Sequence, residues 1–206
     1  VKSFGGNHAL WRTSDTDGRL GWYILLGTIP IGIVGLVFSD QIENNVRTLS
    51  LVAIVMILFS FVLMAADLKG AQNRDVKELT LKDGIIIGLF QALALIPGVS
   101  RSGSTISGGL FLGLDRESAT RYSFLLSVPA VVLSGVFELR KIGDSTGASV
   151  GVAPTVIATL LAFISGYLAI AFLLRFVRTH NFSVFVIYRV AVGVLMLVLL
   201  AAGAVS

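Results

Sequence analysis

Two short apolar segments, at residues 84–96 and 104–114, constrain the fold more than any other part of this sequence. They flank a polar turn, PGVSRSGST at residues 97–105, which contains an arginine. At the helical rise per residue, the segments reach about 20 Å and about 16 Å, whereas the hydrocarbon core of a bilayer is about 30 Å thick. Non-helical backbone is tolerated at that depth only where protein or a water-filled cavity surrounds it. The pattern therefore predicts a re-entrant helix-turn-helix hairpin over residues 84–114, whose turn lines a cavity.

The rest of the sequence is typical of a polytopic helical membrane protein. Of its 206 residues, 55% are hydrophobic and only 14% are charged, unlike a soluble domain. The chain has no cysteine, so it forms neither disulfides nor thiolate metal sites. No linker divides it, and we expect one all-α membrane domain over residues 1–206. Five segments are long and apolar enough to span a bilayer: residues 20–38, 49–66, 122–139, 152–174 and 182–204.

The positions of the basic residues predict how the hairpin lies in the membrane. Lys and Arg fall in short loops between apolar segments and form no basic face, which indicates membrane topology and not nucleic-acid binding. If the hairpin returns to the side it came from, eleven of the sixteen basic residues lie on one side and three on the other. If it crosses the membrane instead, the distribution is nine to five. The positive-inside rule favours re-entry, with Val1 and the hairpin entrance on the cytoplasmic side and Ser206 outside.

The arginine of the turn, Arg101, needs a partner of opposite charge. An uncompensated arginine near the bilayer centre costs at least about 2.5 to 3.5 kcal/mol, yet the turn contains no acidic residue. Its neighbours are hydrogen-bond donors, and a guanidinium fork matches two phosphate oxygens at once. Phosphate is therefore the best candidate ligand. The donors are the hydroxyls of Ser100, Ser102, Ser104 and Thr105 and the backbone amides freed by Gly98 and Gly103.

The backbone of the turn should present these donors at the start of a helix. Pro97 ends the first half of the hairpin, because proline lacks an amide hydrogen and its ring clashes with the preceding turn. Either Ser102 or Ser104 can then cap the second half. The unpaired amides and the positive dipole end of that helix would point at the bound anion.

At this point the sequence resembles a known family. Residues 97–109, PGVSRSGSTISGG, and residues 113–130, GLDRESATRYSFLLSVPA, are similar to the bacterial undecaprenyl-diphosphate phosphatases, or bacitracin-resistance proteins. The resemblance extends to residues 27–36 and 185–193. It implies an active site between two re-entrant hairpins of an inverted repeat, open toward the periplasm in the bacterial inner membrane. It also implies hydrolysis of the lipid diphosphate that carries cell-wall precursors, and hence bacitracin resistance.

The resemblance implies roles for individual residues. It assigns Ser100, Arg101 and Thr105 to catalysis, and places Gln91 where the first hairpin carries an acidic residue. Ser100 as a nucleophile has no visible base here, so we prefer a binding role for it. Arg189, about 10 Å into the last span, could reach a headgroup or snorkel to the interface, and the resemblance favours the site. The expected phosphate-binding residues are Gly98, Ser102, Gly103 and Ser104, with Arg189 and Gln91 in a second tier.

One family motif does not occur in these 206 residues. It is an acidic pair followed by a Ser/Thr-rich turn that ends in histidine. We therefore expect the acid–base groups, and the ligands of a divalent cation such as Mg²⁺, to lie upstream of Val1, and we predict no metal ligand within this chain. Homo-oligomer formation and the preferred lipid length stay open.

Two other functions compete with hydrolysis of the lipid diphosphate. A transporter or flippase of a lipid phosphate or another anion could use the same hairpin, because re-entrant segments also build anion sites in transporters. A membrane scaffold without catalytic activity would leave Arg101 without a partner, so it explains less of the sequence.

Overall fold

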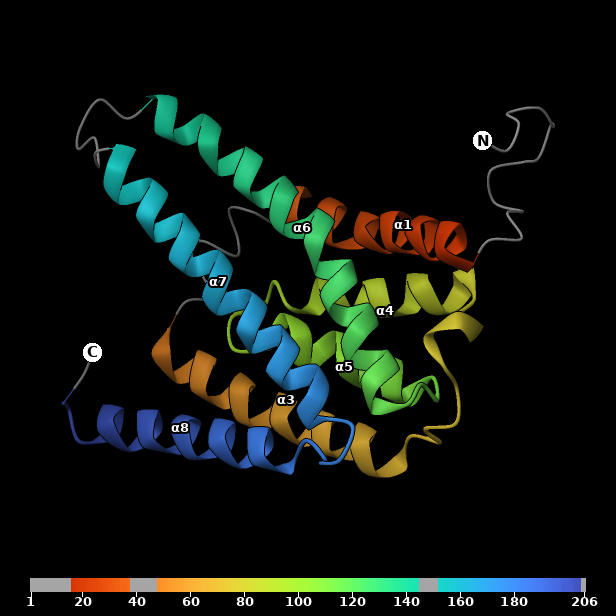
Figure 1. Ribbon diagram of the computed structural model, residues 1–206. Coiled ribbons are helices and arrows are strands. Elements are labelled where there is room, and N and C mark those ends of the chain that lie inside the picture. Colours follow the sequence, from red (N-terminus) through yellow and green to blue (C-terminus); the bar gives the residue numbers. More distant parts are fainter. Residues whose placement is uncertain (1–15, 38–47, 145–151, 205–206) are drawn as a thin grey trace.

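The computed structural model describes residues 16–37, 48–144 and 152–204, and in them the regular elements are helical (Figure 1). This confirms the all-α class. The predicted single domain, residues 1–206, includes residues outside the described ranges, and together with the inverted repeat it stays a prediction. The elements are α1 (Thr16–Val37), α3 (Leu49–Lys69), the 3-10 helix η1 (Val76–Glu78), α4 (Leu81–Leu93), α5 (Arg101–Phe111), α6 (Arg116–Asp144), α7 (Val152–Phe176) and α8 (Ser183–Ala201).

Five of these helices are long and apolar enough to cross a membrane, as predicted. Their boundaries differ from the predicted ones by a few residues, and residue 38 of the first predicted span lies outside the described ranges. The remaining α-helices, α4 and α5, have 13 and 11 residues and are too short to cross. The candidate spans are Asp17–Val37, Leu49–Lys69, Arg116–Val136, Pro154–Phe176 and Ser183–Ala201.

Helices α4 and α5 form a hairpin whose two outer ends meet. Arg74, before α4, forms an isolated bridge with Leu114, after α5. The amide of Arg74 donates to the Gly113 carbonyl at 3.0 Å, and the Asp115 amide donates to the Arg74 carbonyl at 3.0 Å. A broken helix that crossed the membrane would place these segments at opposite ends of the bundle. The hairpin predicted from the distribution of basic residues is therefore confirmed.

The loops at that end of the bundle are held together by ion pairs. The Asp67 carboxylate at the end of α3 accepts from Arg116 Nε at 2.6 Å and from the Phe182 amide at 3.1 Å. Arg178 pairs with Glu117 across the same surface. We call this the basic end of the bundle. Its basic residues, from the loops around α3, α4, α6 and α7, are Lys69, Arg74, Lys77, Lys82, Arg116, Arg121, Arg175 and Arg178.

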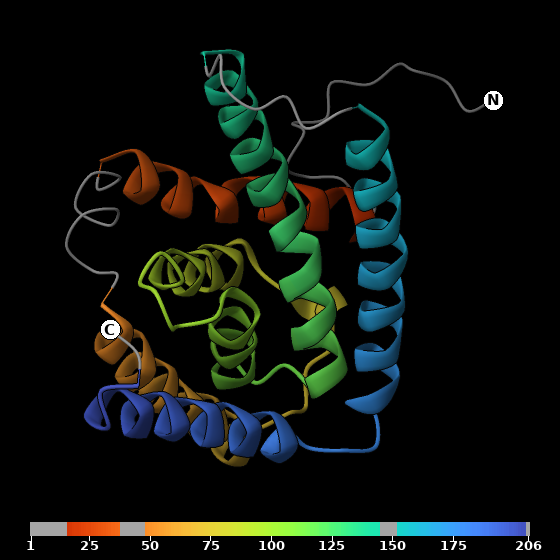
Figure 2. The ribbon, with the colours of Figure 1, turned by 90° about the vertical axis from the view of Figure 1, so that its left-hand side faces the viewer.

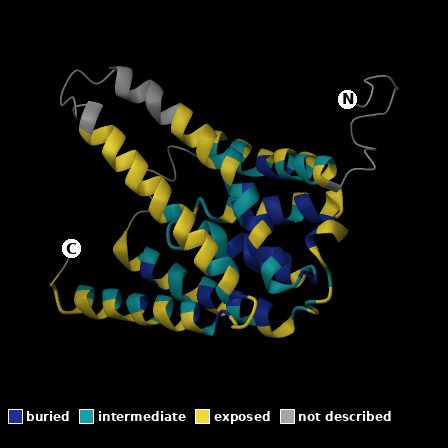
Figure 3. Cartoon of the chain, in the orientation of Figure 1, coloured by how far each residue is buried: buried dark blue, intermediate teal, exposed yellow. Residues whose placement is uncertain are grey.

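The hairpin lies in the middle of the bundle and is enclosed by other helices. Figure 2 shows α4 and α5 between α1, the α3–α8 pair and α6. Every residue of α5 from Ser104 to Leu110 is buried, whereas α7 is exposed along most of its length (Figure 3). The exposed apolar side chains suit a helix that faces lipid, while the polar turn is surrounded by protein, as backbone at membrane depth requires.

Glycines allow α1 and α4 to lie against each other. A Cβ atom added to Gly88 would lie 2.2 Å from the Gly27 carbonyl oxygen, and one added to Gly27 would lie 2.7 Å from the Gly84 carbonyl oxygen. Gly84 and Gly88 are four residues apart on one face of α4, which is the small-residue spacing that permits close helix approach in membranes. The two helices run parallel, because Gly27 faces the start of α4 and Gly35 faces Leu95 just beyond its end.

We expect Gly88→Ala to separate α1 from α4 and to lower the free energy of unfolding by about 1–3 kcal/mol, the usual cost of overpacking. The matched control is Gly32→Ala in α1, where a Cβ atom would meet nothing within 4 Å. Reversible unfolding in mixed micelles measures the free energy of unfolding of both variants. A Gly88→Ala protein as stable as the control would contradict the close packing of these helices.

Candidate anion site at the hairpin turn

The first half of the hairpin stops at a tightened turn before Pro97. The amides of Leu95 and Ile96 donate to the carbonyls three residues earlier, Ala92 at 3.1 Å and Leu93 at 3.0 Å. This is the geometry of a 3-10 turn, which commonly ends an α-helix. In a continued α-helix, the Pro97 ring would clash with the Leu93 carbonyl four residues before it. The predicted role of Pro97 agrees with this local structure.

The chain then reverses through two residues with positive φ. Gly98 has φ +98°, and a Cβ atom there would lie 2.5 Å from the Val52 carbonyl oxygen, so only glycine fits. Ser100 has φ +67°, which is uncommon for a residue with a side chain. Its hydroxyl accepts from the Gly103 amide at 3.3 Å, which makes Ser100 the N-cap of α5. The prediction that Ser102 or Ser104 caps this helix was wrong.

Several donors in this turn have no acceptor. Among the described residues, none accepts a hydrogen bond from the backbone amides of Ser100, Arg101 and Ser102, which we call the amide cradle. The Arg101 guanidinium and the Ser102 hydroxyl likewise have no partner in the described part of the chain. All three residues are half-buried and accessible. Consecutive free amides at a helix N-terminus, in a segment that also carries an arginine, suit an anion.

Two of the predicted site hydroxyls have partners inside the protein. Thr105 Oγ1 donates to the Arg101 carbonyl at 2.9 Å and lies 2.6 Å from Ser123 Oγ of α6. Ser104 Oγ donates to the Phe90 carbonyl of α4 at 2.5 Å. Both side chains are buried, so they join α5 to its neighbours and do not face the cradle. Their roles in catalysis and phosphate binding stay predictions, which this geometry does not favour.

The two second-tier residues, Arg189 and Gln91, are not part of the cradle. Arg189 neither snorkels nor faces the cradle, because its guanidinium donates to the Gly98 carbonyl at 2.8 Å and to Ser60 Oγ at 3.0 Å. Gln91 lies in the last turn of α4 and is fully buried, and neither atom of its amide group has a described partner. Gly103 is half-buried at the start of α5, where its amide bonds the Ser100 hydroxyl.

Ser60 is a residue of this region that the sequence interpretation missed. Its hydroxyl donates to the Met56 carbonyl at 2.7 Å and accepts from Arg189. The available signal was a serine in the middle of the apolar stretch of α3, because polar side chains in membrane helices often bond across to another helix.

The cradle does not suit a cation. It offers amide, hydroxyl and guanidinium donors, whereas Mg²⁺ is bound by carboxylates and other oxygen ligands. Within the residues that the structure describes, there is also no group of three or more His, Cys, Asp or Glu side chains that could hold a metal ion. The donors of the turn therefore suit an anion, and we assign the turn no metal-dependent step.

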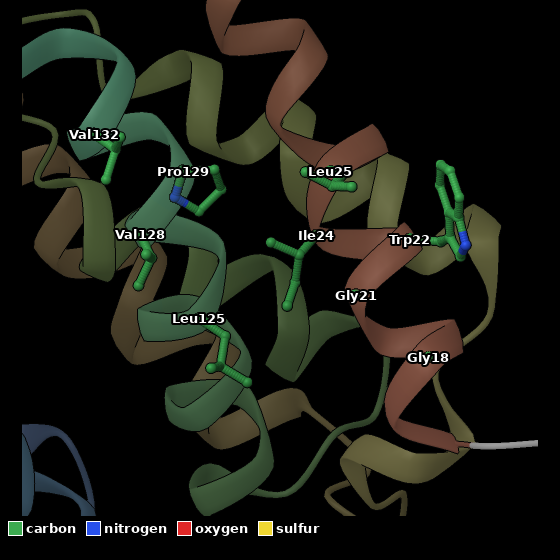
Figure 4. Close-up of a pocket in the computed structure, with 9 residues that line it drawn as sticks. All are labelled: Gly18, Gly21, Trp22, Ile24, Leu25, Leu125, Val128, Pro129 and Val132. Atoms are coloured by element: carbon green, nitrogen blue, oxygen red, sulfur yellow. The ribbon is translucent and has the colours of Figure 1, made fainter. Parts of the chain in front are cut away.

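A hollow of about 590 Å³ between α1 and α6 is separate from this turn. It has no charged or hydroxyl side chain in its lining, so it cannot be the anion site. Figure 4 shows the side chains of the two helices around it. Its lining is Gly18, Gly21, Trp22, Ile24, Leu25, Leu125, Val128, Pro129 and Val132.

We expect Ser102→Ala and Ser104→Ala to have different effects. Ser102→Ala should weaken binding of inorganic phosphate about tenfold without changing stability, because a hydrogen bond to a charged group contributes about 1.5 kcal/mol or more. Ser104→Ala should lower the free energy of unfolding by about 1–3 kcal/mol, because the Phe90 carbonyl lies in the last turn of α4 and loses its donor. Phosphorus NMR titration and unfolding in micelles measure the two quantities. Weaker phosphate binding by Ser104→Ala alone would contradict this assignment.

Comparison with known proteins gives a consistent match. Residues 2–195 match the family model described as Bacitracin resistance protein BacA. The chain is 50% identical over 208 residues to Undecaprenyl-diphosphatase 3 of Frankia alni, across 93% of this chain and 70% of that protein. It is also 50% identical over 196 residues to the Undecaprenyl-diphosphatase of Mycobacterium sp. strain KMS, with the same coverage. The Undecaprenyl-diphosphatase of Nocardioides sp. strain JS614 is 48% identical over 190 residues, across 92% of this chain and 69% of that protein.

Proposed function

The chain belongs to the bacitracin resistance protein BacA family, and we propose that it hydrolyses undecaprenyl diphosphate to undecaprenyl phosphate and inorganic phosphate. This reaction recycles the lipid carrier of cell-wall synthesis and confers resistance to bacitracin, as the family description implies. The single structural observation that carries the proposal is the amide cradle together with the Arg101 guanidinium, which has no partner among the described residues.

The turn fits the charge changes of this reaction. Hydrolysis breaks the bond between the bridging oxygen and the terminal phosphorus, while an oxygen from water joins that phosphorus. Negative charge develops on the leaving undecaprenyl phosphate and is spread over the oxygens of the transferred phosphoryl group. Arg101 binds two of these oxygens, and the cradle amides and the Ser102 hydroxyl donate to others. These donors are in place before the reaction, so they stabilise the transition state without reorganisation.

The described residues supply binding and charge stabilisation, but not every group that the reaction needs. No carboxylate or histidine lies in the turn to accept a proton from water. From the family resemblance we propose that the reaction uses a divalent cation, Mg²⁺. We expect the ligands of this cation and the proton acceptor to belong to the family motif that does not occur in this sequence.

The protein is a multi-pass membrane protein, and we propose that the site opens toward the outer face of the bacterial inner membrane. Helix α3 runs from Leu49 to Lys69, and the turn lies beside Val52, about 25 Å along the helix from the basic end. The positive-inside rule puts the basic end in the cytoplasm. The turn then lies near the periplasmic side, where a lipid diphosphate on that side could reach it.

Phosphate release by the protein made from its complete gene tests the proposal. The purified protein is mixed with undecaprenyl diphosphate in detergent, and both inorganic phosphate and undecaprenyl phosphate are measured with time. We expect equal amounts of the two products. A folded protein that releases neither, but moves a lipid phosphate between the leaflets of vesicles, would instead support a transporter or flippase.

A further inference from the structure

Arg189 is a charged side chain in an otherwise apolar helix, and its contacts explain its position. Helix α8 contains no other charged residue. The Arg189 side chain crosses to α3 and to the hairpin turn, where its Nη2 donates to the Gly98 carbonyl at 2.8 Å and to the Val99 carbonyl at 3.3 Å. The Met56 carbonyl is a further acceptor at 3.4 Å. Each of these acceptors is a carbonyl oxygen of the protein. The hydrogen bonds of Arg189 Nη2 are therefore made within the protein, without a phosphate.

The bond to the Val99 carbonyl fixes the direction of the first amide of the cradle. In a planar trans peptide, the carbonyl and the following N–H point in opposite directions. Because the Val99 carbonyl points toward Arg189, the Ser100 N–H points away from α8. The same interaction turns two carbonyl oxygens, each with a partial negative charge, away from the side on which an anion would bind.

The backbone here needs such a restraint. Gly98 and Ser100, on either side of Val99, both have positive φ, and Ser100 is not a glycine. Conformations of this kind persist only where the surrounding structure holds them. The hydrogen bond from Arg189 Nε to Ser60 Oγ at 3.0 Å aims the guanidinium at the turn, and Ser60 is itself buried.

We propose that Arg189 is a positioning residue for hydrolysis of the lipid diphosphate. It holds the Gly98 and Val99 carbonyls toward α8, so that the Ser100 amide and Arg101 face the substrate. This inference rests on the proposed function. It replaces the second-tier phosphate contact predicted for Arg189 from the sequence.

Steady-state kinetics of three variants test the inference. Arg189→Gln should lower kcat about 10- to 100-fold, because a small displacement of catalytic groups has an effect of this size. Arg189→Lys should recover part of that loss, since an ammonium group can still bond one carbonyl. Ser60→Ala removes a partner of Arg189 that no substrate can touch, and it should lower kcat by about two- to tenfold. Tyr188→Phe, at an exposed neighbouring side chain, is the matched control and should be unchanged.

Two results would overturn the inference. One is a folded Arg189→Gln protein with normal kcat and a raised KM, because that pattern indicates direct substrate binding in the ground state. The other is normal kcat in both Arg189→Lys and Ser60→Ala, which decides the case if Arg189→Gln does not fold. Thermal unfolding of each variant shows whether it is folded.

Binding of inorganic phosphate separates this inference from the proposed function. If the parent protein binds phosphate but releases none from undecaprenyl diphosphate, the proposed function fails. The same variants are then compared by their phosphate affinity. Weaker binding in Arg189→Gln and in Ser60→Ala, with Tyr188→Phe unchanged, supports positioning of the turn, whereas unchanged affinity in both variants overturns it.

Discussion

Replacing Arg101 by alanine is expected to lower kcat for phosphate release about 1,000-fold, which corresponds to about 4 kcal/mol of lost transition-state stabilisation. The guanidinium has no partner in the described part of the chain, so its charge is available to the substrate. The amide cradle remains in this variant and leaves a residual rate. Initial rates of phosphate release from undecaprenyl diphosphate, with thermal unfolding to show that the variant is folded, measure the effect.

Arg101→Lys distinguishes a bidentate contact from simple charge. Lysine keeps the positive charge but cannot donate two parallel hydrogen bonds to a phosphoryl group. We expect kcat about 100-fold below that of the parent, because loss of one well-placed donor to a transition state has this effect. Arg121→Lys is the control, since Arg121 is exposed near the start of α6 at the basic end. Near-normal turnover by Arg101→Lys would mean that Arg101 does not hold the phosphate by two bonds.

Replacing Asp67 by alanine is expected to lower the free energy of unfolding by about 3 kcal/mol, the lower end of the range for removing one partner of a buried ion pair. The Asp67 side chain is only 1% exposed, whereas Arg116 is 31% exposed and can be partly rehydrated. The Phe182 amide loses its acceptor as well, so the hydrogen bonds from the end of α3 to the starts of α6 and α8 are lost. Reversible unfolding in mixed micelles measures this change.

The exposed ion pair at the same end of the bundle provides the control for Asp67. Glu117 and Arg178 are 39% and 61% exposed, and exposed pairs contribute at most about 1 kcal/mol. Glu117→Ala should therefore change the unfolding free energy by less than 1 kcal/mol, within the range of exposed ion pairs. Equal losses in Glu117→Ala and Asp67→Ala would show that burial of Asp67 does not decide its contribution.

The membrane class, the spans and the short hairpin could be predicted because they depend on local composition and length. Apolar segments of about 20 residues cross a bilayer, and shorter ones do not. The prediction of an anion for Arg101 also followed from local sequence, because the turn around it contains donors and no acid. That prediction remains to be tested by phosphate binding. The side of the bundle on which the hairpin ends meet followed from the distribution of basic residues.

The direction of each polar side chain in the turn depended on contacts with distant segments. Ser104 and Thr105 belong to the same motif as Arg101, yet Phe90 and Ser123 bind their hydroxyls. Residue spacing does not give the rotation of a helix about its axis, which decides whether a hydroxyl faces a neighbouring helix or the cradle.

Local sequence was enough to identify a helical membrane protein with a donor-rich turn inside the bundle, because hydropathy, segment length and charge act locally along the chain. Which of these donors lack a partner among the described residues depended on how the helices pack. Ser100 caps α5 in a positive-φ conformation, and Arg189 holds the turn from about 90 residues further along the chain. Contacts between residues so far apart in the sequence depend on how helices pack against one another, and packing is a property of the folded bundle.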